Sequence, residues 1–306
     1  MSDIKLFRLN NGSAVELQAR ASDLEKPLQT LIEKNLEAFL GIRFVATEYS
    51  TGRTHGGRID TLGFDENFCP VIIEYKRSSG ENVINQGLFY LDWLMDHQAE
   101  FKLLVIERFG NETSEQIDWS SPRVLCIASD FTKYDAHAVQ QIGKNIELLR
   151  YRLFGSEFLV FELVNSPIET RPSASVTPHA AVPRVASNWE PDWIEFWERM
   201  PASAQELNQA LDEFLLSLGD DVQKKFLKQY IAYKRLRNFV TVQPYKDGRF
   251  LVFLHLDPET VEIDTDWMRD VREIGHWGTG DLEISVRYPE QIQQLKPLIE
   301  RAYGGT

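Results

Sequence analysis

Two acidic residues and one lysine stand at spacings that suit metal-assisted chemistry. The run Val71–Lys76 is apolar and β-branched until it ends in Glu74, Tyr75 and Lys76. Residues two apart in a strand share a face, so Glu74 and Lys76 are expected to project to the same side. Asp60 lies in the preceding expected strand, and pairing of the two strands as a hairpin would bring it close to Glu74.

Two carboxylates at the end of an apolar strand need compensation, because buried like charges repel and are costly to desolvate. Mg²⁺ or Mn²⁺ would resolve the conflict, since a hard cation takes a few carboxylate oxygens and keeps its remaining waters. A water held near Lys76 could then attack a phosphodiester while the cation stabilises the developing charge. The alternative is a salt-bridge network on a strand edge.

The Glu-x-Lys spacing has no value as evidence by itself. Glu100-Phe101-Lys102 repeats it, and Asp3-Ile4-Lys5 satisfies a looser form. Neither has an upstream Gly-x-x-Asp strand, an apolar run ending at the acid and a downstream Gln-x-x-x-Tyr helix. The set that begins at Asp60 has all three, and its last part, Gln86 and Tyr90, shares one helix face.

These residues together resemble the RecB-like branch of the PD-(D/E)xK nucleases, which includes the mismatch-cleaving endonucleases of archaea and actinobacteria. The resemblance covers about Leu24 to Leu94, and Ile59 stands where the superfamily's proline would be. It implies a restriction-endonuclease-like mixed sheet flanked by helices. It also implies that Asp60 and Glu74 hold Mg²⁺ or Mn²⁺ and that Lys76 orients the attacking water, while Gln86 and Tyr90 either support the site or touch the substrate backbone.

The family pattern also contains an acid on the first helix, and several residues are candidates for it. Glu33 and Glu48 are taken as supporting residues, with Glu25 and Glu37 as further candidates. Glu25 has an alternative role, because Ser22 and Glu25 together look like a capping box that opens a helix. Glu33 and Glu37 have solvated positions as their alternative. His55, in the loop before Asp60, is either a substrate contact or incidental.

Bulk properties predict a globular protein of the cytoplasm. The chain has 306 residues, 43% hydrophobic and 26% charged, with a formal net charge of −13. No apolar run reaches the ~20 residues that span a bilayer, so no membrane partner is expected. No secretory signal is visible, and Cys69 and Cys126 fit reduced core residues.

Apolar periodicity predicts two α/β domains. Residues 1–165 form the nuclease-like domain, 166–191 a proline-rich linker, and 192–306 a smaller α+β domain. In the first domain we expect a strand-rich stretch from 43 to 76, helices over 83–95 and 134–150, and strands over 102–107, 123–128 and 157–164. In the second we expect helices over 192–199, 204–218 and 221–236, strands over 239–243, 250–255 and 282–288, and a final helix after Pro289.

The stretch from Lys224 to Arg249 is basic in an otherwise acidic chain, with eight Lys and Arg residues against Asp247 alone. Aromatic residues are interleaved with them, a mixture that suits phosphate contact and base stacking. The alternative is a solvated helix face with aromatics in the core. The candidate nucleic-acid contacts are Arg58, Lys228, Lys234, Arg235 and Arg237.

The resulting hypothesis is a Mg²⁺-dependent deoxyribonuclease that acts as an endonuclease in repair or defence. Nucleic acid, DNA in particular, is the expected partner, and a homodimer is one open expectation for the assembly. The alternative is a non-catalytic nucleic-acid-binding or accessory module on a nuclease-like fold. The second domain resembles an uncharacterised domain that is often joined to such nuclease-like modules, and this resemblance implies no function.

Overall fold

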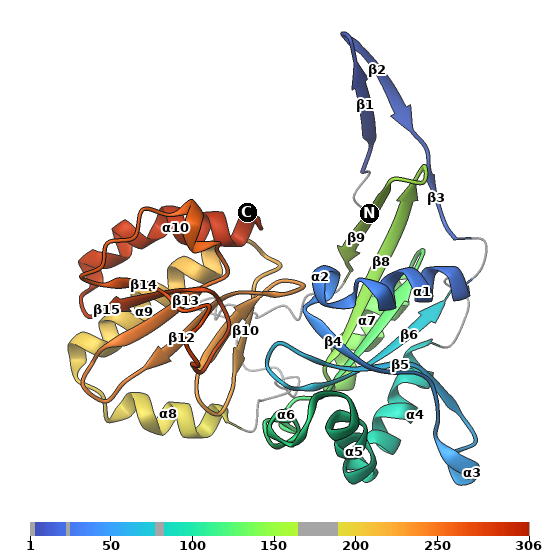
Figure 1. Ribbon diagram of the computed structural model, residues 1–306, viewed down its shortest axis with the longest axis horizontal. Coiled ribbons are helices and arrows are strands. Elements are labelled where there is room, and N and C mark those ends of the chain that lie inside the picture. Colours follow the sequence, from blue (N-terminus) through green and yellow to red (C-terminus); the bar gives the residue numbers. More distant parts are fainter. Residues whose placement is uncertain (1–3, 23–24, 77–82, 165–188, 306) are drawn as a thin grey trace, which may run out of the picture. The chain divides into compact units, whose positions relative to one another are not determined.

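The computed structural model describes residues 4–22, 25–76, 83–164 and 189–305. These residues form two compact units (Figure 1). Most of residues 4–164 belong to the first unit and residues 189–305 to the second. Segments 64–69 and 118–121 group with the second unit, so the two units interleave along the chain. Residues 166–188 of the expected linker lie outside the described part.

The first unit is built on a mixed sheet with strand order β3-β8-β7-β6-β5-β4, and β9 pairs with β8. This sheet, with helices against it, confirms the expected fold class. Its strands are β3 (Ala19–Arg20), β4 (Ile42–Ser50), β5 (Arg58–Asp65), β6 (Pro70–Lys76), β7 (Arg123–Ala128), β8 (Ile146–Phe154) and β9 (Phe158–Leu163). Its helices are α1 (Glu25–Lys34), α2 (Leu36–Leu40), α3 (Gly52–His55), α4 (Val83–Asp96), α5 (Gln98–Phe109), α6 (Asn111–Glu115) and α7 (Lys133–Ile142).

The connections explain the strand directions. Short links join β4 to β5 and β5 to β6, and such links can join only antiparallel neighbours. Helix α4 crosses from β6 to β7, and these strands pair in parallel, as do β7 and β8. Parallel strands are covered on both faces, and every residue of β7 is buried. Strands β5 and β6 therefore lie in the interior of the sheet.

Helices cover both faces of this sheet. Gly87 lets α4 approach β7 closely, since a Cβ there would lie 2.4 Å from Val124 Cγ1. Gln29 of α1 donates a hydrogen bond to the Asp60 carbonyl. Figure 1 shows α1 and α4 on opposite sides of β5 and β6. Strands β5 and β6, which carry Asp60 and Glu74, therefore lie between two layers of helices.

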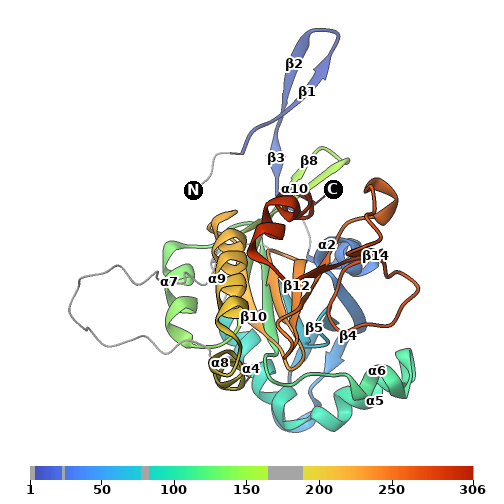
Figure 2. The ribbon, with the colours of Figure 1, turned by 90° about the vertical axis from the view of Figure 1, so that its left-hand side faces the viewer.

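The first two strands, β1 (Leu6–Asn10) and β2 (Ser13–Leu17), form a separate hairpin. Asn11 and Gly12 both have positive φ, 45° and 81°, which suits the tight turn between these strands. Figures 1 and 2 show this hairpin extending away from the sheet of its own unit.

Two predicted elements of the first unit are wrong. Residues 102–107 are not a strand but part of helix α5, where Phe101 and Val105 are buried one turn apart. The run is too short and too apolar for periodicity to separate the two cases. The helix predicted over 134–150 ends at Ile142, because Gly143 takes the left-handed conformation that terminates helices, and β8 follows.

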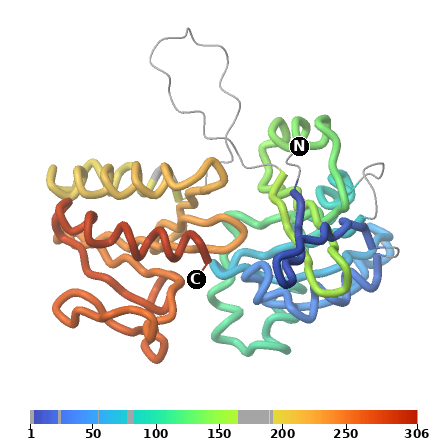
Figure 3. The backbone as a smooth tube through the Cα atoms, turned by 90° about the horizontal axis from the view of Figure 1, so that it is seen from above, coloured from blue at the N-terminus to red at the C-terminus, as the bar shows by residue number. Residues whose placement is uncertain are grey.

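The second unit is an antiparallel sheet with strand order β10-β11-β12-β13-β15-β14. Helices α8 to α10 pack against one hydrophobic core with it, and Figure 3 shows α9 and α10 side by side. Its strands are β10 (Gln223–Phe226), β11 (Ile231–Lys234), β12 (Asn238–Pro244), β13 (Phe250–Leu254), β14 (Met268–Asp270) and β15 (Leu282–Val286). Its helices are α8 (Glu190–Glu198), α9 (Ala202–Ser217), η1 (Pro258–Thr260), η2 (Pro289–Gln291) and α10 (Ile292–Gly304).

The helix predicted over 221–236 is wrong, since this stretch forms the hairpin β10–β11. All four residues of β11 are buried, including Lys234. Burial on both faces of a strand gives a continuous run that carries no strand period, so the pattern alone misleads. The other helices and strands expected in this unit are present.

Cys69 and Cys126 are both buried free thiols, as the sequence predicts. Within the described ranges, no helix combines the length and apolar character needed to cross a membrane.

A buried ion pair ties β7 to β8. Arg123 Nη2 lies 2.6 Å from Glu147 Oε2, and both side chains are 3% exposed. We expect Glu147→Ala to lower the free energy of unfolding by about 3–5 kcal/mol, because the buried guanidinium loses this carboxylate. Urea denaturation measures the loss. The double variant Arg123→Met/Glu147→Leu should recover much of it, and an equal loss in both variants would contradict the explanation.

Candidate active site

Asp60 and Glu74 meet across the β5–β6 hairpin. The backbone N–H of Asp60 donates to Glu74 Oε1 at 3.2 Å, and the backbone N–H of Tyr75 donates to Asp60 Oδ2 at 3.0 Å. One oxygen of each carboxyl is thus fixed by the backbone of the opposite strand. Glu74 is 1% exposed and Asp60 is partly buried. The hairpin that the sequence predicted brings the two acids together.

Burial dominates the electrostatics of this pair. Burial, and then the charge of Asp60, raise the pKa of Glu74 to about 9. Burial also raises the pKa of Asp60, against the opposing effects of the Tyr75 N–H and of Lys76. A pair of carboxyls in this environment does not readily hold two negative charges without a further cation.

Lys76 ends β6 on the same face as Glu74, because residues two apart in a strand project alike. Its charge lowers the pKa of both Asp60 and Glu74. The side chain is only partly buried, so it can reach a ligand at the strand end. Asp60, Glu74 and Lys76 therefore lie close together.

Glu48 is the acid of β4 nearest to this pair in electrostatic terms, since its charge raises the pKa of both Asp60 and Glu74. Its own pKa is lowered, chiefly by a hydrogen bond from Lys26 at 2.7 Å. Arg58 Nε lies 2.6 Å from its other oxygen. Its φ of 51° is unusual for a non-glycine residue and marks an irregularity in the strand.

The other acid candidates lie differently. Glu33 accepts hydrogen bonds from Thr61 Oγ1 at 2.6 Å and from Gln29 Nε2 at 3.0 Å. Thr61 follows Asp60 in β5 and so points to the opposite face, away from Glu74. Glu25, in the first turn of α1, still raises the pKa of Asp60, whereas Glu37 pairs with Arg43 on the surface.

The glycine and tyrosine of the motif contact each other. A Cβ on Gly57 would lie 2.6 Å from Tyr90 Cε1, so only glycine allows this approach. The Tyr90 hydroxyl accepts the backbone N–H of Arg58 at 3.2 Å, which fixes the start of β5. Gln86, one turn earlier on α4, is partly buried.

Sequence reasoning missed Gln29. Its Nε2 donates to the Asp60 carbonyl at 2.8 Å and contacts Thr47 at 3.2 Å, and the residue is 3% exposed. It therefore ties α1 to the strand that carries Asp60. A polar residue beside Leu28 on the apolar stripe of an amphipathic helix was the available signal.

His55 lies in an aromatic group, with its ring 5.2 Å from Phe89 and 5.9 Å from His97. A pocket of about 270 Å³ opens beside it. The pocket lies next to the loop that leads into β5. It is lined by Ser50, Thr51, Gly52, Arg53, His55, Trp93, His97 and Glu100.

Three of the five basic residues proposed as nucleic-acid contacts are paired with acids or buried within the second unit. Arg235 pairs with Asp221 at 2.6 Å, Arg237 pairs with Glu66 at 3.2 Å, and Lys234 is 3% exposed. Lys228 remains exposed, with its ammonium 5.8 Å from the Trp189 ring centroid. Arg58 belongs to the first unit, and its side chain is 68% exposed.

The carboxyls of Asp60 and Glu74 suit a cation that takes few protein ligands and keeps its waters. Among the described residues, no group of three or more His, Cys, Asp and Glu is arranged to hold a metal ion. A site enclosed by protein ligands is therefore not present in these ranges. Mg²⁺, by contrast, is commonly held by one or two carboxylates and completed by water and phosphate oxygens. The Asp60–Glu74 pair suits that mode, since one oxygen of each carboxyl is engaged by an N–H group.

The first unit thus combines a mixed sheet flanked by helices with a buried carboxylate pair and an adjacent lysine. Residues 195–306 match the family model described as "Domain of unknown function (DUF5655)". An uncharacterised protein of Haemophilus influenzae is 27% identical over 98% of this chain and 99% of that protein.

Three solved structures are similar to part of the chain, each with a TM-score of 0.24. A repair endonuclease from Pyrococcus abyssi is 16% identical over 43% of this chain and 50% of that one. EndoMS in complex with double-stranded DNA is 17% identical over 48% and 64%, and EndoMS in apo form is 21% identical over 43% and 48%. The chain spans about half to two thirds of the length of these proteins, so their activities are not transferred to it.

The raised pKa of Glu74 predicts a pH-dependent stability. Below its ordinary value of 4.5 the carboxyl is protonated in both states. From there to about 9 the folded state binds a proton that the unfolded state releases, so the free energy of unfolding falls as pH rises. Glu74→Gln removes this effect, at about 1.4 kcal/mol per pKa unit.

We therefore expect the Glu74→Gln variant in EDTA to be more stable than the parent at pH 8, by a few kcal/mol, with little difference at pH 5. Urea denaturation at both pH values measures this. A variant that is less stable at pH 8 would show that Glu74 is ionised and fully compensated in the metal-free protein.

Proposed function

We propose that the protein is a metal-dependent endonuclease that hydrolyses phosphodiester bonds in DNA. The observation that carries the proposal is the buried Asp60–Glu74 pair, cross-linked by backbone hydrogen bonds, with Lys76 on the same face. DNA is proposed as the substrate from the resemblance of the whole motif set to PD-(D/E)xK nucleases.

The residues would divide the work as follows. The carboxylates of Asp60 and Glu74 hold Mg²⁺ or Mn²⁺, which supplies Lewis-acid polarisation of a phosphate oxygen when bound. The Lys76 ammonium orients the attacking water and stabilises negative charge near it. Gln86 and Tyr90 support the site, Tyr90 through the Arg58 backbone at the start of β5.

The pKa of Glu74 links metal binding to pH. A carboxyl must lose its proton to bind a cation, so binding releases a proton and strengthens as pH rises. Burial raises the pKa of Glu74 to about 9, so metal-free protein at neutral pH holds this proton. The proposed nuclease therefore becomes more active from pH 6 to pH 8 at a limiting concentration of cation.

The first experiment is incubation of purified protein with single- and double-stranded DNA, with Mg²⁺, Mn²⁺ or EDTA. We expect cleavage that needs the cation and that falls at least about 100-fold in Glu74→Gln and Asp60→Asn, since each removes charge from the cation site. Glu107→Gln, an exposed acid on α5, is the matched control and should leave the rate unchanged. Binding of DNA without cleavage by the parent, and no Mn²⁺ binding by calorimetry, would favour the binding-module alternative.

Arg58 is expected to contact the substrate backbone beside Asp60. In the cleavage-blocked Glu74→Gln background, Arg58→Ala should weaken DNA binding and reduce the slope of log affinity against log salt by about 1. Arg235→Ala is the matched control, because Arg235, like Arg58, pairs with a carboxylate at 2.6 Å but belongs to the second unit. Fluorescence anisotropy over a salt series measures both, and an equal effect of the two changes would place the DNA elsewhere.

A further inference from the structure

The turn that joins the two strands of the carboxylate pair has a defined and strained geometry. Its backbone is closed by hydrogen bonds from Phe68 N–H to the Asp65 carbonyl at 2.8 Å and from Asp65 N–H to the Cys69 carbonyl at 2.9 Å. Phe68 has a φ of 58°, a conformation that non-glycine residues rarely adopt. The Asp65 carboxylate also accepts the N–H groups of Asn67 and Cys69, at 2.9 and 3.0 Å.

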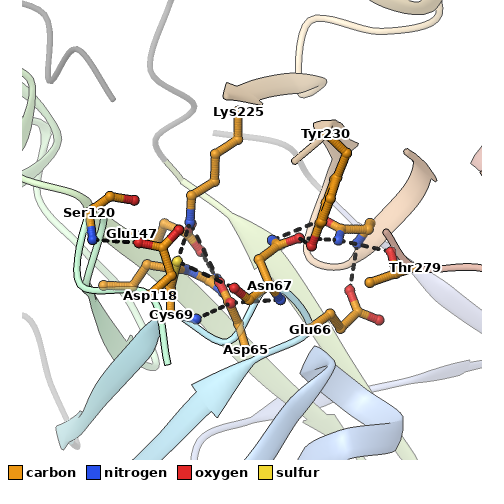
Figure 4. A network of polar contacts seen from close by, with 12 residues as sticks. Asp65, Glu66, Asn67, Cys69, Asp118, Ser120, Glu147, Lys225, Tyr230 and Thr279 are labelled. Carbon is orange, nitrogen blue, oxygen red and sulfur yellow. Dashed lines mark hydrogen bonds and ion pairs between the residues drawn. The ribbon is translucent and has the colours of Figure 1, made fainter. Parts of the chain in front are cut away.

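By its contacts this turn belongs to the second unit. Glu66 accepts the backbone N–H of Asn238 at 2.8 Å and pairs with Arg237 at 3.2 Å. Asn67 Oδ1 accepts hydrogen bonds from the Tyr230 hydroxyl at 3.0 Å and from Asn238 Nδ2 at 2.8 Å. Figure 4 shows Asn67 between Glu66 and Tyr230, with Thr279 beside them.

The two ends of the turn also contact residues of the second unit. The Lys225 ammonium lies 3.4 Å from Cys69 Sγ and 3.7 Å from Asp65 Oδ2. Figure 4 shows the Lys225 side chain extending toward these two residues. Cys69 packs in a small buried cluster with Leu227, Tyr230 and Ala232. Residues at both ends of the turn, as well as its tip, are therefore held by β10, β11 and the start of β12.

The turn also sets the register of the carboxylate pair. Asp65 and Cys69 are hydrogen-bonded across the hairpin. Asp60 lies five residues before Asp65 (65 − 60 = 5), and Glu74 lies five after Cys69 (74 − 69 = 5). Continued without a bulge, this register places Asp60 opposite Glu74, and the hydrogen bond from the Asp60 N–H to Glu74 Oε1 agrees with it. A slip of one residue at the turn would send one carboxyl to the other face of the sheet.

We propose that Glu66 and Asn238 are positioning residues for the proposed nuclease reaction, which hold the β5–β6 turn so that Asp60 and Glu74 stay in metal-binding register. The inference rests on the proposed function. Polar contacts suit this role, since a hydrogen-bonded network fixes one arrangement where apolar contacts tolerate several. The strain at Phe68 is also consistent with a turn that is held by its surroundings.

The test uses the full chain with two matched substitutions. Glu66→Gln removes the charge that pairs with Arg237, and Glu283→Gln does the same to an equivalent pair. Glu66 and Glu283 are 14% and 7% exposed at the side chain, and each faces a partly exposed arginine, at 3.2 and 2.7 Å. Glu283 lies in β15, and its ion pair with Arg269 involves no residue of the turn.

Three readouts separate positioning from simple stability. Thermal unfolding reports the loss of stability, calorimetry with Mn²⁺ reports metal affinity, and hydrogen exchange by mass spectrometry reports peptides that cover residues 58–76. We expect both variants to lose similar stability. Glu66→Gln alone should weaken Mn²⁺ binding by about tenfold, equivalent to ~1.4 kcal/mol, and speed exchange in 58–76.

Asn238→Ala should reproduce the effect of Glu66→Gln, because it removes the amide that joins Asn67 to Thr279. Equal Mn²⁺ affinity and equal exchange in Glu66→Gln and Glu283→Gln would overturn the proposal. The exchange measurement needs neither metal nor nucleic acid. If the parent protein binds no Mn²⁺ and cleaves no DNA, the proposed function fails. Faster exchange of residues 58–76 in Glu66→Gln would still show that Glu66 holds the hairpin, and unchanged exchange would show that it does not.

Discussion

The burial of two carboxyls on facing strands is the constraint on which the rest of this structure depends. Asp60 and Glu74 face each other in the interior of a sheet, and burial is the largest cause of the raised pKa of each. The same burial that disfavours two negative charges strengthens their attraction for a cation, because the surroundings are less polarisable than water. The pair is thus unfavourable in its doubly ionised form, and the proposed cation would offset that cost.

The elements around the pair share the task of fixing it. Gln29 of α1 holds the backbone of Asp60 from one face, and Tyr90 of α4 holds the start of β5 through Arg58. Gly57 permits that contact because it has no side chain. Small backbone displacements would separate two carboxyls whose hydrogen bonds cross the hairpin, so support from both faces matters for a cation site.

The second unit contributes differently. Several of its basic residues form ion pairs within the unit, such as Arg235 with Asp221 and Arg237 with Glu66. The unit also contains the 64–69 turn, so a chain cut after the first unit would leave buried groups such as Asn67 without their partners. The two units are therefore interleaved in sequence, and neither corresponds to one continuous stretch.

The local parts of the site could be predicted from the sequence, because they depend on short-range geometry. The period of two in a strand places Glu74 and Lys76 together, and the short link between β5 and β6 brings Asp60 to them. The helix that carries Gln86 and Tyr90 follows from spacing alone. The mixed sheet flanked by helices was predicted from the family resemblance that these residues carry.

Long-range packing decided the rest. Which glutamate lies near the pair depends on the face that α1 presents and on the irregularity at Glu48, and neither has a local signal. The stretch 221–236 was predicted as a helix although it forms two strands, because β11 is buried on both faces and carries no strand period. The short run 102–107 could be fitted to either period. The sequence by itself determined the β5–β6 hairpin and its facing carboxyls, whereas only the tertiary structure decided which side chains surround them, since those contacts join residues far apart in the chain.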